Sequence, residues 1–208
     1  ASYYKNNEPG ATVIVTKDGK TLFRKAYGMS DMQAKRTMQP DDVMRLGSIT
    51  KQFTAVSILL LVDEGKLALS DTVQSVFPDY PETGKKITIE HLLTHTSGIP
   101  SYTSKPGFSA MMDKDISVAD MVASFKNDAL EFEPGSRYNY SNSGYFLLGA
   151  IIEKISGDTY AKFVEKRLFQ PLEMMHTAYE GFERSKQTQA AGHAANAGGF
   201  VASKVISM

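Results

Sequence analysis

The sequence predicts an α+β fold in which an antiparallel hairpin comes first and helices follow. Residues 11–15 and 21–27 read as strands on either side of Asp18-Gly19, a pair typical of the tight turn in a β-hairpin. Residues 48–64 then form a strongly apolar run of helical length, and residues 145–155 place apolar side chains at helical spacing. Because a two-stranded hairpin is not stable alone, we expect it to pack on the helices or to join further strands.

The remaining elements are predicted from caps and chain breakers. Apolar residues occupy nearly every position of 48–64, so we expect a helix that is buried on all sides and ends at Gly65. Capping residues followed by apolar positions predict shorter helices after Thr88, Ser117 and Asp158. Residues 190–199 are rich in Ala and Gly and predict a loop.

Length and composition exclude several classes of protein. The chain has 208 residues, enough for one large domain or two small ones. Its 23 Lys and Arg residues balance 23 Asp and Glu residues, which argues against nucleic acid as a partner, because phosphate binding needs a basic excess. No apolar run reaches the length of about 18 residues that suggests a membrane span. The absence of cysteine excludes disulfides, thiolate zinc sites and a cysteine nucleophile.

The first motif with chemical potential is Ser48-Ile49-Thr50-Lys51, at the start of the apolar helix. Residues three apart share a helix face, so the Ser48 hydroxyl and the Lys51 amine are expected one turn apart. A serine hydroxyl is a weak nucleophile until a base takes its proton, and a desolvated lysine can be that base. The helix N-terminus also favours an oxyanion. Taken alone, the pattern is more often an N-cap serine followed by a surface lysine.

The second motif is Tyr140-Ser141-Asn142. A tyrosine beside a lysine ammonium can have a lowered pKa and can then act as a general base. The asparagine amide offers both a donor and an acceptor to a substrate amide or to the lysine. Taken alone, polar residues that follow Pro134-Gly135 also fit a loop that leads into a helix.

The third motif, His95-Thr96-Ser97-Gly98, allows two interpretations. A histidine close to a serine suggests a Ser-His dyad. Gly98 and Pro100 are turn-forming residues, however, and they favour a histidine that bonds to backbone in a tight turn.

Together these motifs resemble the serine β-lactamase and penicillin-binding protein superfamily, in its branch of class C β-lactamases, D-amino-acid peptidases and β-lactamase-like esterases. The resemblance runs in order over residues 11 to 203 and includes the segments 46–55, 87–98, 142–149 and 171–177. It implies a β-lactamase-like fold, with a helical lobe packed beside an antiparallel sheet lobe. Only the N-terminal hairpin of that sheet lobe is evident in the sequence.

The resemblance also implies roles for individual residues. Ser48 would be the acylated nucleophile, and its backbone N–H one donor of the oxyanion hole. Lys51 would accept or relay the Ser48 proton, Tyr140 would be the base in acylation or deacylation, and Asn142 would position the substrate. No metal or organic cofactor is implied, and His95 receives no role. The implied partner is a small acyl substrate, namely a β-lactam, a D-amino-acid peptide or a small ester.

One element of the family pattern is missing from the sequence. The family has a Lys-Thr-Gly or His-x-Gly triplet on a strand beside the nucleophile. Ser203-Lys204-Val205 and Gly192-His193-Ala194 are the candidates here, and neither has the glycine in place. We therefore expect a fragment whose remainder is disordered, cleaved or supplied by another chain, in preference to a shortened homologue with impaired chemistry.

The expected organisation has three parts. Residues 1–45 form the hairpin part of the α/β lobe, residues 46–189 form the helical lobe that carries both motifs, and residues 190–208 begin the return to the α/β lobe. The resemblance and the Ala-Ser-Tyr-Tyr start predict a periplasmic or secreted protein after signal removal, and a cytoplasmic location is the alternative.

The sequence thus predicts a serine hydrolase that works through an acyl-enzyme on Ser48. The alternative is a catalytically impaired, penicillin-binding-like sensor or interaction protein. An α/β-hydrolase is disfavoured because no Gly-x-Ser-x-Gly occurs. A metal hydrolase is disfavoured because the four histidines form no His-Glu-x-x-His motif or similar cluster.

Overall fold

The computed structural model describes residues 4–112, 114–179 and 189–203, which fall into two compact units. The first unit lies within Ala1–Arg45 and Gly181–Ile206, and the second lies mainly within Leu46–Glu180. The first contains strands and the second contains helices, which agrees with the predicted α+β class. No helix in these described ranges is long and apolar enough to cross a membrane.

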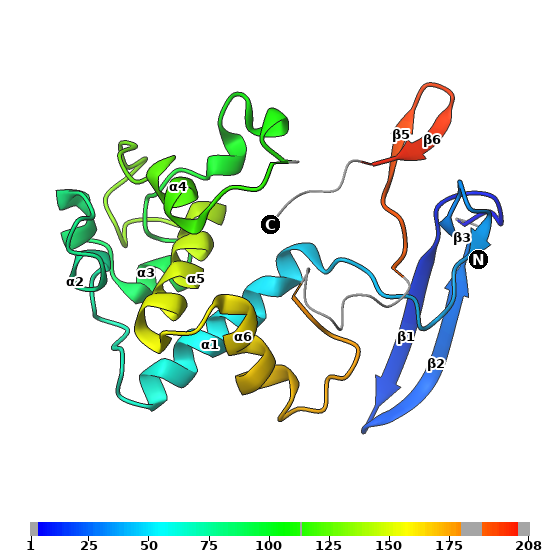
Figure 1. Ribbon diagram of the computed structural model, residues 1–208, viewed down its shortest axis with the longest axis horizontal. Helices are drawn as coiled ribbons and strands as arrows, with labels where there is room; N and C mark the ends of the chain where they lie inside the picture. Colours follow the sequence, from blue (N-terminus) through cyan, green and yellow to red (C-terminus); the bar gives the residue numbers. More distant parts are fainter. Residues whose placement is uncertain (1–3, 113, 180–188, 204–208) are drawn as a thin grey trace. The chain divides into compact units, whose positions relative to one another are not determined.

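The N-terminal hairpin of the first unit is confirmed. Strand β1 (Ala11–Lys17) pairs antiparallel with β2 (Lys20–Tyr27), as Figure 1 shows. Asp18 and Gly19 connect them with φ of 50° and 72°. Positive φ at both central residues is the requirement of the primed turn whose twist matches that of the strands.

Two further strand pairs were not predicted. Strands β3 (Met29–Asp31) and β4 (Arg36–Thr37) form one pair, and β5 (His193–Asn196) and β6 (Gly199–Ala202) form the other. The predicted loop over 190–199 is therefore wrong. Hydrogen bonds with distant residues hold this segment, because the Ala190 and Ala191 N–H groups donate to the carbonyls of Val43 and Ser30.

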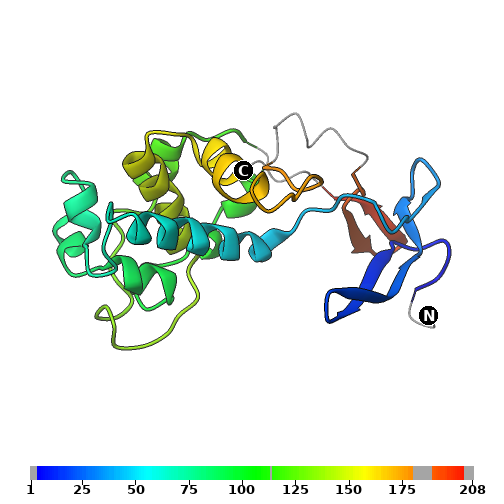
Figure 2. The same ribbon diagram turned by 90° about the horizontal axis from the view of Figure 1, so that it is seen from below.

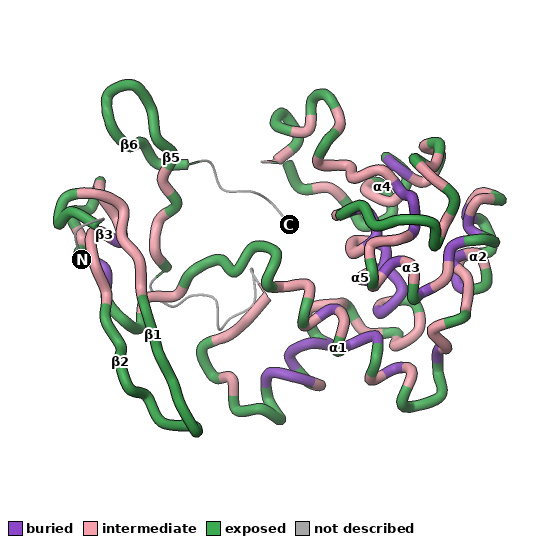
Figure 3. Tube along the Cα trace, turned by 180° about the vertical axis from the view of Figure 1, so that it is seen from behind, coloured by how far each residue is buried: buried purple, intermediate pink, exposed green. Residues whose placement is uncertain are grey.

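The β1–β2 hairpin leaves much of its apolar surface open. Its exposed apolar side chains are Val13, Ile14, Val15, Leu22 and Phe23, and both strands are coloured mainly as exposed in Figure 3. Over the described residues β1 and β2 form a sheet of two strands. The expected joining of this hairpin to further strands is therefore not seen among the described residues.

The second unit consists of short and long helices joined by turns. Its elements in chain order are η1 (Gly47–Ile49), α1 (Thr50–Asp63), α2 (Val73–Val76), η2 (Glu82–Lys85), α3 (Ile89–Leu93), η3 (Tyr102–Ser104), η4 (Phe108–Ala110), α4 (Val118–Ala123), α5 (Asn142–Ser156), α6 (Tyr160–Val164) and η5 (Glu165–Phe169). Figures 1 and 2 show α1, α5 and α6 lying side by side.

The helix caps bear out most of the predicted starts. The side chains of Thr88 and Ser117 accept backbone N–H groups at the starts of α3 and α4. The predicted cap at Asp158 is wrong, because the Thr159 side chain accepts the Lys162 N–H at the start of α6. The Asp158 N–H instead donates to Ser156 Oγ in the preceding turn.

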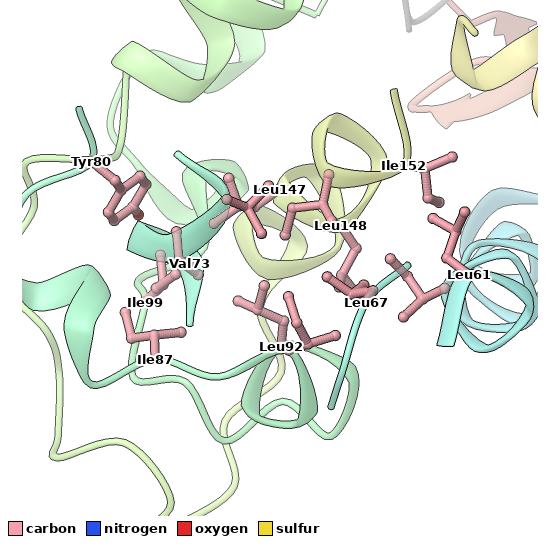
Figure 4. Packing of buried hydrophobic residues seen from close by; sticks show 14 of the residues in the cluster. Leu61, Leu67, Val73, Tyr80, Ile87, Leu92, Ile99, Leu147, Leu148 and Ile152 are labelled. Carbon is pink, nitrogen blue, oxygen red and sulfur yellow. The ribbon is translucent and has the colours of Figure 1, made fainter. Parts of the chain in front are cut away.

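Helix α5 forms the centre of the core. Its apolar face is fully buried and packs against residues of α1, α2 and α3, as Figure 4 shows. The contacting side chains include Leu147 and Leu148 of α5, Leu61 of α1, Val73 of α2 and Leu92 of α3. Burial of each such side chain stabilises the fold by about 1.5–3 kcal/mol, so this packing fixes the helices that carry both motifs.

Helix α1 is buried on one side only, so the predicted burial on all sides is wrong. Ile58 and Leu61 are fully buried against the core. Val56 and Leu59 are 45% and 48% exposed on the opposite side. The apolar run has two faces, and only one of them contacts the helical core.

Two glycines with the same backbone conformation but different surroundings allow the packing of the turn after α3 to be tested. Gly98 and Gly157 have nearly equal φ values of +76° and +75°, and a Cβ at Gly98 would lie 2.3 Å from the Phe132 carbonyl oxygen. A Cβ at Gly157 would meet nothing within 4 Å. We expect Gly157→Ala to cost about 1 kcal/mol, the price of a left-handed non-glycine residue. We expect Gly98→Ala to cost about 3 kcal/mol or more because the steric clash adds to that strain. Urea unfolding of the two variants measures the difference, and equal costs would contradict the close packing at Gly98.

Candidate active site

Ser48 lies in the turn that leads into α1. It belongs to η1, directly after Gly47, whose φ is +54°, and its side chain is exposed. Lys51 follows in the first turn of α1, and its Nζ lies 3.5 Å from Ser48 Oγ. The structure therefore brings the serine hydroxyl and the lysine amine together at the start of the helix.

Tyr140 reaches the same hydroxyl from the loop before α5. Its OH donates to Ser48 Oγ at 2.8 Å, across 92 positions of the sequence. Lys51 Nζ lies 4.8 Å from the centroid of the Tyr140 ring. The Ser48 oxygen thus accepts from both the phenol and the amine, while its own proton is used in neither bond.

Asn142 begins α5 and has both ends of its amide in hydrogen bonds. Lys51 Nζ donates to Asn142 Oδ1 at 2.8 Å, and Asn142 Nδ2 donates to Thr103 Oγ1 at 2.9 Å. Its backbone N–H donates to Ser101 Oγ at 3.1 Å, and the Ser101 and Thr103 hydroxyls lie 2.9 Å apart. In this structure the Asn142 amide holds the lysine beside Ser48.

The surroundings of Tyr140 lower the pKa of its phenol. Burial alone would raise the pKa of Tyr140, but hydrogen bonding with Lys51 and Ser48 and the charge of Lys51 together lower that pKa. Tyr140 is 40% exposed, so solvent screens part of this effect. A lowered pKa makes the phenolate easier to reach and fits the role of a proton acceptor.

The structure brings together the four side chains that the sequence singled out, and it adds supporting residues that the sequence did not indicate. Ser101 and Thr103 lie in a stretch whose sequence carries no signal beyond its polar composition. His95 was interpreted as a turn histidine that bonds to backbone, and its Nδ1 does accept the Ser141 N–H at 3.1 Å. The contact of its ring with the Tyr140 ring, with centroids 4.4 Å apart, was not predicted.

The candidates for the third family triplet have other surroundings. His193 begins β5 in the first unit, where its Nε2 accepts the Met32 N–H at 3.3 Å. Lys204 and Val205 lie outside the described residues. Within the part of the chain that the structure describes, no three His, Asp or Glu side chains gather in a way that could hold a metal ion.

Comparison with known proteins places the chain among related sequences and structures. The family model described as Beta-lactamase matches residues 3–206. Penicillin-binding protein 4* of Bacillus subtilis (strain 168) is 39% identical over 170 residues, which cover 80% of this chain and 37% of that protein.

Two solved structures show the same architecture. The octameric penicillin-binding protein homologue from Pyrococcus abyssi has a TM-score of 0.82 at 33% identity, over 95% of this chain and 47% of that chain. The D-amino acid amidase from Ochrobactrum anthropi SV3 has a TM-score of 0.75 at 31% identity, over 90% of this chain and 52% of that chain. The chain thus spans about half the length of these solved relatives or less.

The influence of Lys51 on Tyr140 can be measured directly. We expect Lys51→Met to raise the pKa of Tyr140, because the variant loses both the hydrogen-bonding group and the positive charge. Titration of ¹³Cζ-labelled tyrosine by NMR measures this pKa, and the Tyr140→Phe spectrum identifies the resonance. Lys66→Met, in the same unit but paired with Glu64, is the control and should leave the titration unchanged. An unaltered Tyr140 titration in Lys51→Met would contradict the assigned electrostatics.

Proposed function

The chain belongs to the beta-lactamase family, and from this membership and the site geometry we propose that it is a serine hydrolase that forms an acyl-enzyme on Ser48. The observation that carries the proposal is the Ser48 hydroxyl, which lies 2.8 Å from the Tyr140 oxygen and 3.5 Å from Lys51 Nζ. A nucleophile within reach of a base that a third group orients is the general arrangement of covalent catalysis.

Acylation proceeds in this proposal through proton transfer to Tyr140. The phenol first gives its proton to solvent water, and the Lys51 ammonium nearby stabilises the resulting phenolate. The phenolate then takes the Ser48 proton while Ser48 Oγ bonds to the carbonyl carbon of the substrate. As the tetrahedral intermediate collapses, the bond to the leaving group breaks and the amine or alcohol departs with the proton from Tyr140. In deacylation Tyr140 takes a proton from water, the water oxygen bonds to the acyl carbon, the bond from that carbon to Ser48 Oγ breaks, and Tyr140 returns the proton to Ser48.

The proposed substrate class rests on family membership together with the activated serine. A serine with a nearby base can attack the carbonyl of a small acyl substrate, and the classes proposed are a β-lactam, a D-amino-acid amide or peptide, or a small ester. The names of the relatives, a penicillin-binding protein and a D-amino acid amidase, support the first two of these classes. Asn142 serves in this proposal to hold Lys51 and to border the substrate.

The central test is covalent labelling of Ser48. We expect a fluorescent penicillin or a fluorophosphonate to add one acyl or phosphonyl group to the protein, because both reagents trap an activated serine. Intact-mass and peptide mass spectrometry locate the adduct, and Ser48→Ala should abolish it. Absence of any adduct on Ser48 with either reagent would sink the proposal, whereas a penicillin adduct that persists for hours would favour the sensor alternative.

A second test isolates the proton acceptor. We expect Tyr140→Phe to slow the labelling of Ser48 by about 10²–10⁴-fold, the usual contribution of a general base. Tyr138→Phe is the matched control, since Tyr138 is 65% exposed and lies two residues before Tyr140. Stopped-flow fluorescence with the labelled penicillin measures both rates. Equal rates in the wild type and Tyr140→Phe would remove Tyr140 from the mechanism.

A third test concerns the hydroxyl that supports Asn142. We expect Thr103→Val to slow the labelling of Ser48 by about 10-fold, because the Asn142 amide loses its acceptor and can turn away from Lys51. Thr103→Ser keeps the hydroxyl and should stay close to the wild-type rate. If valine and serine behave alike, the bond between Asn142 and Thr103 does not orient the site.

A further inference from the structure

The loop after α3 carries a histidine that the proposed mechanism does not use. We propose that His95 is a positioning residue, which fixes the Tyr140 phenol beside Ser48 by bonding to both chain neighbours of Tyr140 and by packing on its ring. The link to catalysis rests on the proposed function, while the positioning itself can be tested without any reaction.

His95 makes two hydrogen bonds to the backbone on either side of Tyr140, and we call this pair of bonds the bracket. The Asn139 N–H donates to the His95 carbonyl oxygen at 2.9 Å, and the Ser141 N–H donates to His95 Nδ1 at 3.1 Å. One residue thus holds the positions immediately before and after Tyr140. Ser141 is only 2% exposed and caps α5 through its bond with the Gly144 N–H, so the bracket has a fixed base.

The His95 ring also lies between two tyrosine rings, one of which belongs to the residue that contacts Ser48. The His95 ring lies 4.4 Å from the Tyr140 ring at an interplanar angle of 32°, and 4.9 Å from the Tyr145 ring at 33°. Tyr145 in turn is anchored because its OH donates to the Leu93 carbonyl at 3.0 Å. Contact between aromatic rings adds about 0.5–1.5 kcal/mol to the burial of their surface. The imidazole is therefore a spacer between an anchored tyrosine of α5 and the tyrosine that contacts Ser48.

The backbone of His95 adopts a conformation that is rare for residues other than glycine. Its φ is +58°, a left-handed value that few residues other than glycine adopt. Such a conformation persists where the surrounding contacts determine it. Here it allows the carbonyl and the side chain of one residue to reach Asn139 and Ser141 together. Asn is one of the residues that tolerates this φ, which makes His95→Asn a suitable variant.

The bracket requires an imidazole without a proton on Nδ1. Protonation would set an N–H on Nδ1 against the Ser141 N–H and break the bond. Burial, and next the charge of Lys51 on α1, lower the pKa of His95. The other titratable groups that pack on the ring are the phenols of Tyr138, Tyr140 and Tyr145. Because the pKa is lowered, the bracket is intact at neutral pH and is lost as the pH falls through the folded-state value.

The first experiment follows the bracket by NMR and needs no substrate. The wild-type protein is labelled uniformly with ¹⁵N and carries ¹³C-labelled histidine. We expect the Ser141 amide resonance to titrate with the same midpoint as the His95 ring, at a pH below the ordinary histidine pKa of 6.5. In His95→Asn the side-chain oxygen replaces the Nδ1 acceptor and does not titrate, so the Ser141 amide should stay constant over this range. A Ser141 amide that ignores the His95 titration in the wild type would overturn the proposal.

The second experiment connects the bracket to the reaction. We expect His95→Ala to slow labelling of Ser48 by fluorescent penicillin by about 10- to 100-fold, since small misplacements of a reacting group have effects of this size. His95→Asn should restore most of the rate near neutral pH, and His176→Asn is the control for loss of a histidine elsewhere in the unit. Equal losses in His95→Ala and His95→Asn, with both variants folded by circular dichroism, would overturn the role of the acceptor. A wild-type protein that titrates as expected but never labels would instead refute the proposed function and leave the positioning role standing.

Discussion

The packing of α5 on α1 is the constraint on which the candidate site depends. The two helices share a buried apolar contact, and the first turn of each carries a site residue, Asn142 on α5 and Lys51 on α1. Ninety-one positions of sequence separate these residues, yet the amine and the amide oxygen lie 2.8 Å apart. A shift of α5 by a single residue would move Asn142 about 1.5 Å along the axis and rotate it away from Lys51. The apolar core thus sets the precision of a polar site.

A chain of hydroxyl and amide groups extends this precision outward. Ser48 is held by Lys51 and Tyr140, Lys51 by Asn142, and Asn142 by Thr103. Each member uses its hydrogen-bonding groups on the next, which limits the orientations that any of them can adopt. This order is what a reaction with a short-lived charged intermediate requires, because the dipoles are aligned before the charge appears.

The sequence predicted the parts of the structure that depend on near neighbours. Asp18-Gly19 specified its hairpin because the positive φ values are a local demand, and Thr88 and Ser117 marked helix starts for the same reason. The family was predicted correctly because its motifs are local too. The fold class was also correct, as the arrangement of strands and helices confirms.

The sequence could not show features that come from distant contacts. The β5–β6 pair was missed because its supporting bonds run to residues far earlier in the sequence, such as the bond between Met32 and His193, which spans 161 positions. Thr103 was missed because a hydroxyl in a polar stretch of sequence has no pattern that shows its contact with Asn142, 39 positions later. The exposed side of α1 was missed because an apolar side chain looks the same in sequence whether or not a partner covers it.

The exposed hairpin of the first unit has a consequence for colloidal behaviour. Its strands carry cations beside their apolar side chains, and the register sets Val13 opposite Lys25 and Lys17 opposite Lys20. A second hairpin that approached along an open edge would bring cation against cation while it offered apolar surface and unpaired backbone. Natural sheets commonly guard their edges with lysine in this way. The protection is electrostatic, so dissolved salt weakens it, and the same strands grow more adhesive as ionic strength rises.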